Sequence, residues 1–282
     1  MPATQPIPIR ITCQTRNYYP STRFHNPSNC IPIGTVGTPI DCFTPTILMT
    51  NICHILNKVD ELHAIVEVNN PSLVMITESW LNREIPDSAV AIGHKFQVYR
   101  HDRQSPGGGV LAYVDVSVPV TRITNLEDED KEVLWLLLKP QRTPRPFSVI
   151  IVVGVYYPPG QTVENEKGMT EYLTKGLDTL LKDFPSAGVF VVGDFNEMKL
   201  NILCNRFNLK KVVRSQTRGG NVLDQILTNM KDLYNEVVHL PPVGRSDHQC
   251  LLYHPRKDPN IKPTLRTVRL MKPSKLKLLG VK

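Results

Sequence analysis

The stretch VFVVGDFN, residues 189–196, joins a short apolar run to side chains that can do chemistry. Its three valines predict a buried strand, and Gly193 lets the backbone turn or approach another segment closely. Asp194 and Asn196 are two residues apart, so on an extended segment they share a face while Phe195 points to the other. A carboxylate beside a carboxamide can orient water and hold a phosphate oxygen. Taken alone, this stretch is explained more readily by a plain turn in which both side chains only satisfy backbone donors.

Other polar side chains stand at the ends of apolar runs. Asn51 ends the run TILMTN (46–51), and Glu78 follows the run LVMIT (73–77). A carboxylate directly after a fully apolar strand is costly to bury unless it binds a cation or another partner. Hard cations such as Mg²⁺ take oxygen ligands and keep several waters, so one or two carboxylates suffice. These strand ends therefore predict a cation site.

The triplet Ser246-Asp247-His248 precedes the last apolar run. Asp247 and His248 are adjacent, so their side chains can face the same way only through a turn, which Gly244 permits. A single histidine is more often a surface or core residue than a catalytic one. His248 therefore indicates catalysis only in combination with the other polar groups.

The elements that must position these groups follow from hydrophobic periodicity and breaker residues. Helices are predicted near 55–66, 166–184 and 199–207, and Asn70-Pro71 ends the first of them. Strands are predicted at 46–51, 73–77, 96–100, 110–114, 133–138, 148–156, 189–192, 222–227 and 250–253. The glycines at 107–109 lack the Lys-Ser/Thr ending of a phosphate loop and predict a hairpin turn. Strands outnumber helices, which predicts an α+β fold: a two-sheet β-sandwich flanked by helices, with a site built from strand ends.

Seven motifs stand in a characteristic order along the chain. They are TNICHILNKVDEL, ITESWL, YRHDR with GGGVLAYV, VYYPP, VVGDFN, TRGGNVLDQILTN and RSDHQ. In order and approximate spacing they resemble the endonuclease/exonuclease/phosphatase superfamily, in the apurinic-type endonuclease variant carried by non-LTR retrotransposons. GDFN or SDH alone would be weak signals, but the full ordered set is specific and covers about residues 46–254. The resemblance implies the four-layer DNase I-like fold.

The resemblance also implies a metal and phosphate site. Glu78 matches the principal Mg²⁺ ligand, Asn51 the amide that helps to hold the metal and the scissile phosphate, and Asp247 an additional metal-site carboxylate. Mg²⁺ is the implied cofactor, and Mn²⁺ can substitute for it. Thr217 and Ser246 match hydroxyl positions near the substrate phosphate.

The remaining matched residues carry the catalytic roles. Asp194 matches the residue that activates or orients the attacking water, and Asn196 a hydrogen-bond donor to the transition state. Asp224 matches the carboxylate that fixes the imidazole of His248. Cleavage of a phosphodiester needs an in-line water, a cation on the non-bridging oxygen and stabilisation of extra negative charge, which these groups supply. The division of the general-base role between Asp194 and His248 stays open.

Two points of the match need comment. Tyr156 matches the phenol that positions the phosphate, although its neighbour Tyr157 fits nearly as well by spacing. After Asn51 the usual run Ala-Arg-Ser-Leu is replaced by Ile-Cys-His-Ile at 52–55. No cation replaces the arginine there, which predicts a weaker grip on the substrate from that side.

The basic balance lies at the ends of the chain. The net charge of the chain is +7. Residues 256–282 carry nine Lys or Arg against Asp258 alone, a charge of +8, and residues 1–44 carry +2, so residues 45–255 are left with −3. Residues 1–44 are rich in Pro, Thr and Asn without periodicity and are expected to be disordered. We therefore expect a catalytic domain at 45–255 and a basic tail at 256–282, disordered or a truncated linker, that can meet nucleic acid.

The remaining composition indicates the compartment. None of the six cysteines lies in a C-x-x-C pair or in a zinc-site spacing, and Cys204 and Cys250 are expected to be reduced core residues. The longest apolar run, 149–155, is far too short to span a bilayer. We expect an intracellular protein with no membrane contact and no obligate protein partner. The resemblance implies DNA as its partner and a nuclear location.

Three functions are compatible with these residues. The first is a Mg²⁺-dependent phosphodiesterase of the retrotransposon endonuclease type that nicks one DNA strand and leaves a 3′-hydroxyl. The second is a phosphatase of the same fold that acts on a small phosphoester. The third is an inactive remnant that binds nucleic acid. Nothing resembles a polymerase, so the chain is expected to be a severed piece that lacks its reverse-transcriptase region or a stand-alone descendant.

Overall fold

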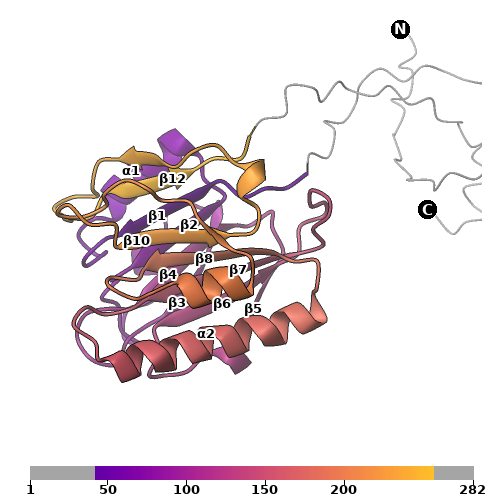
Figure 1. The fold of residues 1–282 in the computed structure, drawn as a ribbon. Helices are drawn as coiled ribbons and strands as arrows, with labels where there is room; N and C mark the ends of the chain where they lie inside the picture. The colour runs from indigo at the N-terminus through magenta and orange to yellow at the C-terminus, as the bar shows by residue number, and fades with distance from the viewer. Residues whose placement is uncertain (1–41, 257–282) are drawn as a thin grey trace, which may run out of the picture. The chain divides into compact units, whose positions relative to one another are not determined.

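The computed structural model describes residues 42–256, which form two stacked six-stranded sheets (Figure 1). The first sheet has the order β11-β12-β1-β2-β4-β3, and the second has the order β5-β6-β7-β8-β10-β9. Helices cover the two outer faces, so the layers run helix, sheet, sheet, helix. The predicted α+β sandwich is confirmed.

The first sheet contains one parallel pair among antiparallel neighbours. Strands β1 and β2 run parallel, whereas β12 pairs with β1, and β4 with β2, in the antiparallel sense. The strands in sheet order are β11 (Val238–Leu240), β12 (Cys250–Tyr253), β1 (Ile47–Asn51), β2 (Leu73–Thr77), β4 (Val110–Asp115) and β3 (Phe96–His101).

The second sheet repeats this plan. Strands β7 and β8 run parallel, and β6 and β10 flank them in the antiparallel sense. The strands in sheet order are β5 (Val120–Arg122), β6 (Val133–Leu138), β7 (Ile150–Tyr156), β8 (Gly188–Asp194), β10 (Asp224–Thr228) and β9 (Lys210–Lys211).

Alternating side chains on the strands build separate cores. On β6, Leu134 and Leu136 enter the core between the sheets, whereas Val133 and Trp135 enter the core under the helices of the second sheet. This is the period of two expected for strands that are buried on both faces. At the centre the sheets approach so closely that a Cβ on Gly154 would lie 2.4 Å from the sulfur of Met75.

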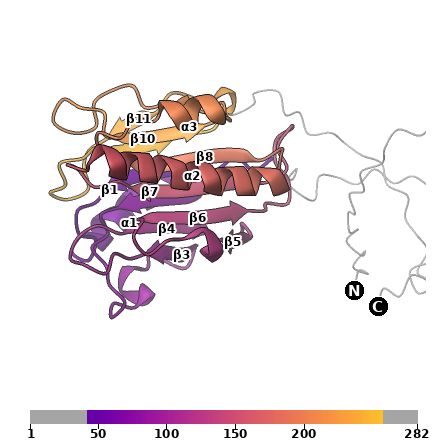
Figure 2. The same cartoon turned by 60° about the horizontal axis from the view of Figure 1, so that its bottom comes forward.

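Within residues 42–256, three α-helices lie outside the sheets. Helix α2 (Val163–Asp183) crosses the second sheet (Figure 2) and begins at Thr162, whose hydroxyl accepts a hydrogen bond from the Asn165 N–H. Helix α1 (Val59–Asn69) packs on the first sheet and ends at Asn70, which is left-handed (φ 45°) and precedes a proline. The third helix and three 3₁₀ turns are α3 (Asn201–Arg206), η2 (Asp87–Val90), η3 (Thr124–Leu126) and η4 (Lys231–Leu233). No helix among residues 42–256 is long and apolar enough to cross a membrane.

Several predicted details are borne out or corrected. The glycines at 107–109 join the antiparallel strands β3 and β4, all with positive φ, as the hairpin prediction required. Cys250 is buried and Cys204 is partly buried, and both are free thiols. The first helix begins at residue 59 rather than 55, because 55–58 form a turn, although Ile55 is fully buried. The edge strands β5, β9 and β11 were not predicted, since each has only two or three residues.

The predicted terminal segments, 1–44 and 256–282, lie outside the described residues except for 42–44 and Arg256. The division of the chain at 45–255 therefore stays a prediction. Arg256 belongs with the folded region, because its Nε donates to the Tyr234 carbonyl at 2.8 Å.

The two parallel pairs deliver their carboxyl ends to the same end of the sandwich. Asn51 and Thr77 are partners at the end of β1 and β2, and Tyr156 and Asp194 are partners at the end of β7 and β8. Antiparallel pairing also places the start of β10, Asp224, opposite Asp194. The functional candidates therefore converge although up to 200 residues separate them in sequence.

Candidate active site

Asn51 links the two sheets at this end of the sandwich. Its side-chain Nδ2 donates to Glu78 Oε1 at 2.8 Å and to Asp194 Oδ2 at 2.9 Å, and the residue is almost fully buried. Its Oδ1 accepts a hydrogen bond from the Cys53 N–H at 3.2 Å. One amide therefore holds two carboxylates in place, one from each sheet.

Glu78 is half-buried and leaves the strand β2 in a left-handed conformation, with φ 52°. Its Oε1 also accepts from the Tyr156 hydroxyl at 3.0 Å, and its Oε2 accepts from the indole N–H of Trp80 at 3.2 Å. Burial and the adjacent Glu78 charge raise the pKa of Tyr156, so this phenol stays a neutral donor. The neighbouring Tyr157 packs instead into the core under α2, so Tyr156 is the tyrosine that faces the site.

Gly193 shapes the strand end that carries Asp194. A Cβ at this position would lie 1.8 Å from the carbonyl oxygen of Val155 on the neighbouring strand, so no other residue fits. Asp194 then ends the strand, and burial, followed by the charge of Asp224, raises its pKa to about 6. A carboxyl group with this pKa can accept a proton near neutral pH.

Asn196 lies in a turn rather than on an extended segment, which corrects the premise that it shares a strand face with Asp194. It is left-handed (φ 45°), and its N–H donates to Asp194 Oδ1 at 3.0 Å. Its side-chain Nδ2 donates to the Tyr157 carbonyl at 2.8 Å. Phe195 between them is buried in the core, as predicted.

His248 and Asp224 form a buried pair. The imidazole Nδ1 lies 2.8 Å from Asp224 Oδ2, and its Nε2 lies 3.9 Å from Asp194 Oδ2 with no hydrogen-bond partner among the described residues. Burial lowers the pKa of His248, but the hydrogen bond and charge of Asp224 and the charge of Asp194 outweigh it, so the pKa is raised overall. The two carboxylates therefore favour the charged imidazolium more than water does, and its Nε2 is open to a partner. The turn predicted at Gly244 is present (φ 59°) and turns the chain ahead of His248.

The two predicted phosphate hydroxyls are engaged with backbone groups. Thr217 Oγ1 accepts from the N–H groups of Leu223 and Asp224 at 3.1 and 3.2 Å. Ser246 Oγ donates to the Asn51 carbonyl at 2.7 Å and accepts from the His248 N–H at 3.2 Å. In this arrangement both hydroxyls position catalytic candidates, and their contact with a phosphate stays a prediction.

Asp247 lies at the edge of the site. Its side chain is 59% exposed, its Oδ2 accepts from the Arg218 Nε at 2.6 Å, and its Oδ1 lies 3.9 Å from His248 Nε2. The carboxylate is thus within reach of the imidazole but paired with a surface arginine.

A comparison with sequence families identifies the family to which the chain belongs. The model of the endonuclease/exonuclease/phosphatase family matches residues 50–248, which include all of the predicted site residues. The chain belongs to this family. The membership confirms the predicted superfamily and places the chain among phosphoester hydrolases of the nuclease and phosphatase type.

Solved structures agree on the fold. The endonuclease domain of TRAS1, a telomere-specific non-LTR retrotransposon, is 16% identical with a TM-score of 0.56, over 75% of this chain and 98% of that one. The AP endonuclease LMAP from Leishmania major is 15% identical with a TM-score of 0.60, over 82% and 94%. The 3′ phosphatase NExo from Neisseria is 13% identical with a TM-score of 0.57, over 76% and 100%. No curated protein sequence matches the chain.

Two places among residues 42–256 could hold a metal ion. Glu78 suits a hard cation, because its three donors, Asn51, Tyr156 and Trp80, are all neutral and none of them cancels its charge. As the side chains lie, Asn51 presents its NH₂ group rather than its oxygen to the carboxylates, so its predicted role as a ligand requires the amide to turn.

The second group is Asp194, Asp224 and His248, whose potential ligand atoms lie within 4.8 Å of one another. A cation there would have to displace the proton between His248 and Asp224. The hydrogen-bonded pair explains that group without a metal, so Glu78 is the better candidate.

Three residues near the site were not assigned a role from the sequence. Trp80 and Arg103 belong to the motifs ITESWL and YRHDR, so the signal was present. Arg103 donates through Nε to Glu132 at 2.9 Å, and its guanidinium carbon lies 5.6 Å from the Tyr156 ring centroid. Lys58 Nζ donates to the Ile52 and Cys53 carbonyls at 2.5 and 2.7 Å. Lys58 is a cation under the loop where the family arginine is missing, but it is buried and supports the loop from inside.

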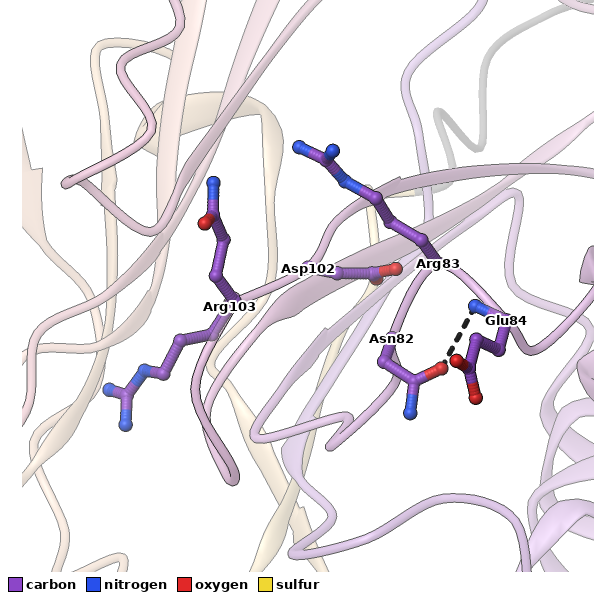
Figure 3. A pocket seen from close by; sticks show the side chains of 6 residues that line it. Asn82, Arg83, Glu84, Asp102 and Arg103 are labelled. Carbon is purple, nitrogen blue, oxygen red and sulfur yellow. Dashed lines mark hydrogen bonds between the residues drawn. The ribbon is translucent and has the colours of Figure 1, made fainter.

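A hollow of about 380 Å³ lies between the segments 82–84 and 102–104 (Figure 3). Asp102 points toward the segment of Asn82 and Arg83, whereas Arg103 points away from it. The hollow contains none of the predicted catalytic residues, so it is a neighbour of the site rather than its centre. Its lining residues are Asn82, Arg83, Glu84, Asp102, Arg103 and Gln104.

Proposed function

We propose that this protein is a metal-dependent DNA endonuclease that nicks one strand and leaves a 3′-hydroxyl. The observation that carries the proposal is the convergence of Glu78, Asn51 and Asp194 on one side with the buried His248–Asp224 pair on the other. Phosphodiester hydrolysis needs a group that accepts a proton, a carboxylate that can bind a cation, and a buried hydrogen-bond donor that stabilises negative charge. Asp194, Glu78 and His248 are suited to these three roles. The likeness to the TRAS1 endonuclease domain and to AP endonucleases supports DNA as the substrate.

The residues take distinct parts in this reaction. Asp194 accepts a proton from the water that attacks phosphorus, and Asn51 holds its carboxylate in position. The Nε2–H of His248 donates a hydrogen bond to the charge that develops on the phosphate, while Asp224 keeps the ring in one orientation. Glu78 would hold a divalent cation, which would supply Lewis-acid polarisation of a phosphate oxygen when bound. As the water oxygen bonds to phosphorus, the bond from phosphorus to the 3′-oxygen breaks. The released 3′-oxygen takes a proton from solvent water, which leaves a 3′-hydroxyl and a 5′-phosphate.

Nicking of supercoiled plasmid tests the proposal. The wild-type chain should relax the plasmid in Mg²⁺ or Mn²⁺ and not in EDTA. At the Mg²⁺ concentration that suffices for the wild-type chain, Glu78→Gln should lose most of this activity. Glu61→Gln, which changes an exposed carboxylate on α1, is the matched control and should retain it. Added zinc should not be required.

The ends of the nick distinguish the alternatives. A nick that a DNA polymerase extends without prior treatment has the expected 3′-hydroxyl. Release of phosphate from a 3′-phosphorylated oligonucleotide without plasmid nicking would instead indicate a phosphatase. Nicking that persists in excess EDTA would show that the metal assignment is wrong.

A further inference from the structure

The two tryptophans of this chain lie in opposite environments. Trp135 is fully buried and donates its indole N–H to the Tyr172 hydroxyl at 3.0 Å. Trp80 is 42% exposed, although it lies two residues after the candidate metal ligand Glu78. Leaving so large an apolar ring in contact with water forgoes burial energy that a core position would provide. The exposure calls for a partner that covers the ring.

The Trp80 ring is held in place although it is exposed. Its backbone N–H donates to the Gly108 carbonyl at 2.9 Å, and its indole N–H donates to Glu78 Oε2 at 3.2 Å. The residue has φ 56°, a left-handed conformation that is unfavourable for a bulky side chain and persists only where surrounding contacts fix it. Gly107 lies near the indole edge, since a Cβ added to it would be 3.9 Å from the ring.

A second ring extends this surface. The centroid of the His54 ring lies 5.7 Å from that of Trp80, at an interplanar angle of 49°. His54 is also left-handed, with φ 76°, and its N–H donates to the Glu78 carbonyl at 2.9 Å. His54 and Trp80 together form an aromatic ledge that is anchored through backbone and side chain to Glu78.

We propose that this aromatic ledge stacks against an unpaired nucleobase next to the scissile phosphate. The inference rests on the proposed function, since it takes DNA as the substrate. A flat, fixed and partly exposed indole offers the surface on which proteins stack bases of single-stranded or distorted nucleic acid, and such stacking tolerates any base. Because Trp80 is hydrogen-bonded to Glu78, a base on its ring belongs to a nucleotide beside the phosphate held there. The ledge therefore favours DNA with an unpaired base over fully paired duplex.

The alternative role of Trp80 is to hold Glu78 in position through its indole N–H. The two roles separate by substitution. Trp80→Phe keeps a flat ring and removes the N–H, whereas Trp80→Leu removes both. Stacking predicts that the Phe variant keeps most of the affinity for DNA with an unpaired base and that the Leu variant loses about 5- to 150-fold in Kd. Ile202→Ala, which changes an exposed apolar residue on α3, is the control. It should leave the Kd for DNA with an unpaired base and the Kd for fully paired DNA unchanged.

Trp80 fluorescence gives a direct readout. Fluorescein-labelled duplexes, one with a single unpaired thymine and one fully paired, are titrated in EDTA. They are also titrated in Mg²⁺ with the Asp194→Ala protein, which should nick slowly, and anisotropy reports binding in both cases. In the Trp135→Phe protein all tryptophan emission comes from Trp80, so stacking should quench it and shield it from acrylamide, more with the unpaired thymine. If Trp135→Phe fails to fold, the unmodified protein is used, because acrylamide reaches exposed Trp80 and not buried Trp135.

Each outcome decides the question. Binding by anisotropy with unchanged Trp80 emission and acrylamide access overturns the stacking role. Equal losses of Kd in the Phe and Leu variants also overturn it and leave Trp80 as a positioning residue for Glu78. If the wild-type chain binds neither duplex and does not nick plasmid, the proposed function itself fails, and the stacking inference fails with it.

Discussion

The two sides of the candidate site differ in their contact with solvent. The inner group, Asp194, Asp224 and His248, is at most 1% exposed, and its members contact one another. The outer group, Glu78, Trp80 and Asp247, lies at a half-open edge. Ionised side chains are costly to bury, so the inner charges are held by partners, whereas the outer groups stay accessible to a cation and to DNA. In the proposed function, the buried inner group therefore carries the proton chemistry, and metal and substrate enter from the outer side.

The largest expected effect comes from removing the inner group. His248→Ala and Asp194→Ala should each lower the single-turnover nicking rate by about 10² to 10⁴ or more, because a positioned acid or base contributes on this scale. Each change also leaves buried carboxylate or imidazole without its partner, so thermal unfolding must be followed in parallel. A folded His248→Ala protein that nicks at the wild-type rate would show that the inner group is structural.

Coupling within the inner group is the next test. Asp224 contacts His248 through one hydrogen bond of 2.8 Å and is itself fully buried, so it should act through the imidazole. The double change Asp224→Ala with His248→Ala should therefore be little slower than His248→Ala alone. Rates that multiply in the double variant would assign Asp224 a separate role. The measurement is single-turnover nicking of all three variants under one condition.

The inner and outer groups also differ in how far the sequence predicted them. The strands β2, β6 and β12 were predicted residue for residue, because fully apolar runs bounded by polar residues leave few alternatives. Parallel strand pairing brings together the predicted residues Asn51, Glu78, Tyr156 and Asp194. The order of the motifs implied this convergence, whereas hydrophobic periodicity alone could not predict it. Pairing across two sheets depends on tertiary packing between segments far apart in the chain.

Contacts at the outer edge were not predictable. The pairing of Arg218 with Asp247 and the tilt of His54 against Trp80 depend on turns with left-handed residues, which carry no periodic signal. Likewise Lys58 was not expected to turn its ammonium inward, because lysines are rarely buried. The sequence therefore predicts the strand ends well and the loops that complete the site poorly.

A smaller effect is expected at the outer Asp247. The ion pair between Arg218 and the Asp247 carboxylate is exposed, and exposed ion pairs contribute only about 0 to 1 kcal/mol of stabilisation. Arg218→Gln should therefore change the nicking rate less than about fivefold. Asp247→Asn should raise the Mg²⁺ concentration for half-maximal nicking if Asp247 assists the metal, but by less than Glu78→Gln does. An Asp247→Asn protein that needs more Mg²⁺ than Glu78→Gln would make Asp247 the principal ligand. Mg²⁺ titrations of the three variants give the comparison.

The smallest effect on chemistry is expected from the basic tail, outside the described residues. Arg256 donates to the Tyr234 carbonyl, so the tail is best deleted from residue 257 onward. Deleting residues 257–282 removes eight Lys or Arg together with Asp258, a charge of +7. Each neutralised phosphate adds about 0.9 to the magnitude of the log–log salt slope of DNA affinity, so the shortened chain should bind more weakly and with a flatter slope. Single-turnover cleavage at saturating DNA should stay near that of the full chain, since every catalytic candidate precedes the cut. Binding titrations at several salt concentrations measure the slope for both chains. An unchanged slope would place the phosphate-binding surface on the folded domain and show that residues 257–282 contribute little to DNA affinity.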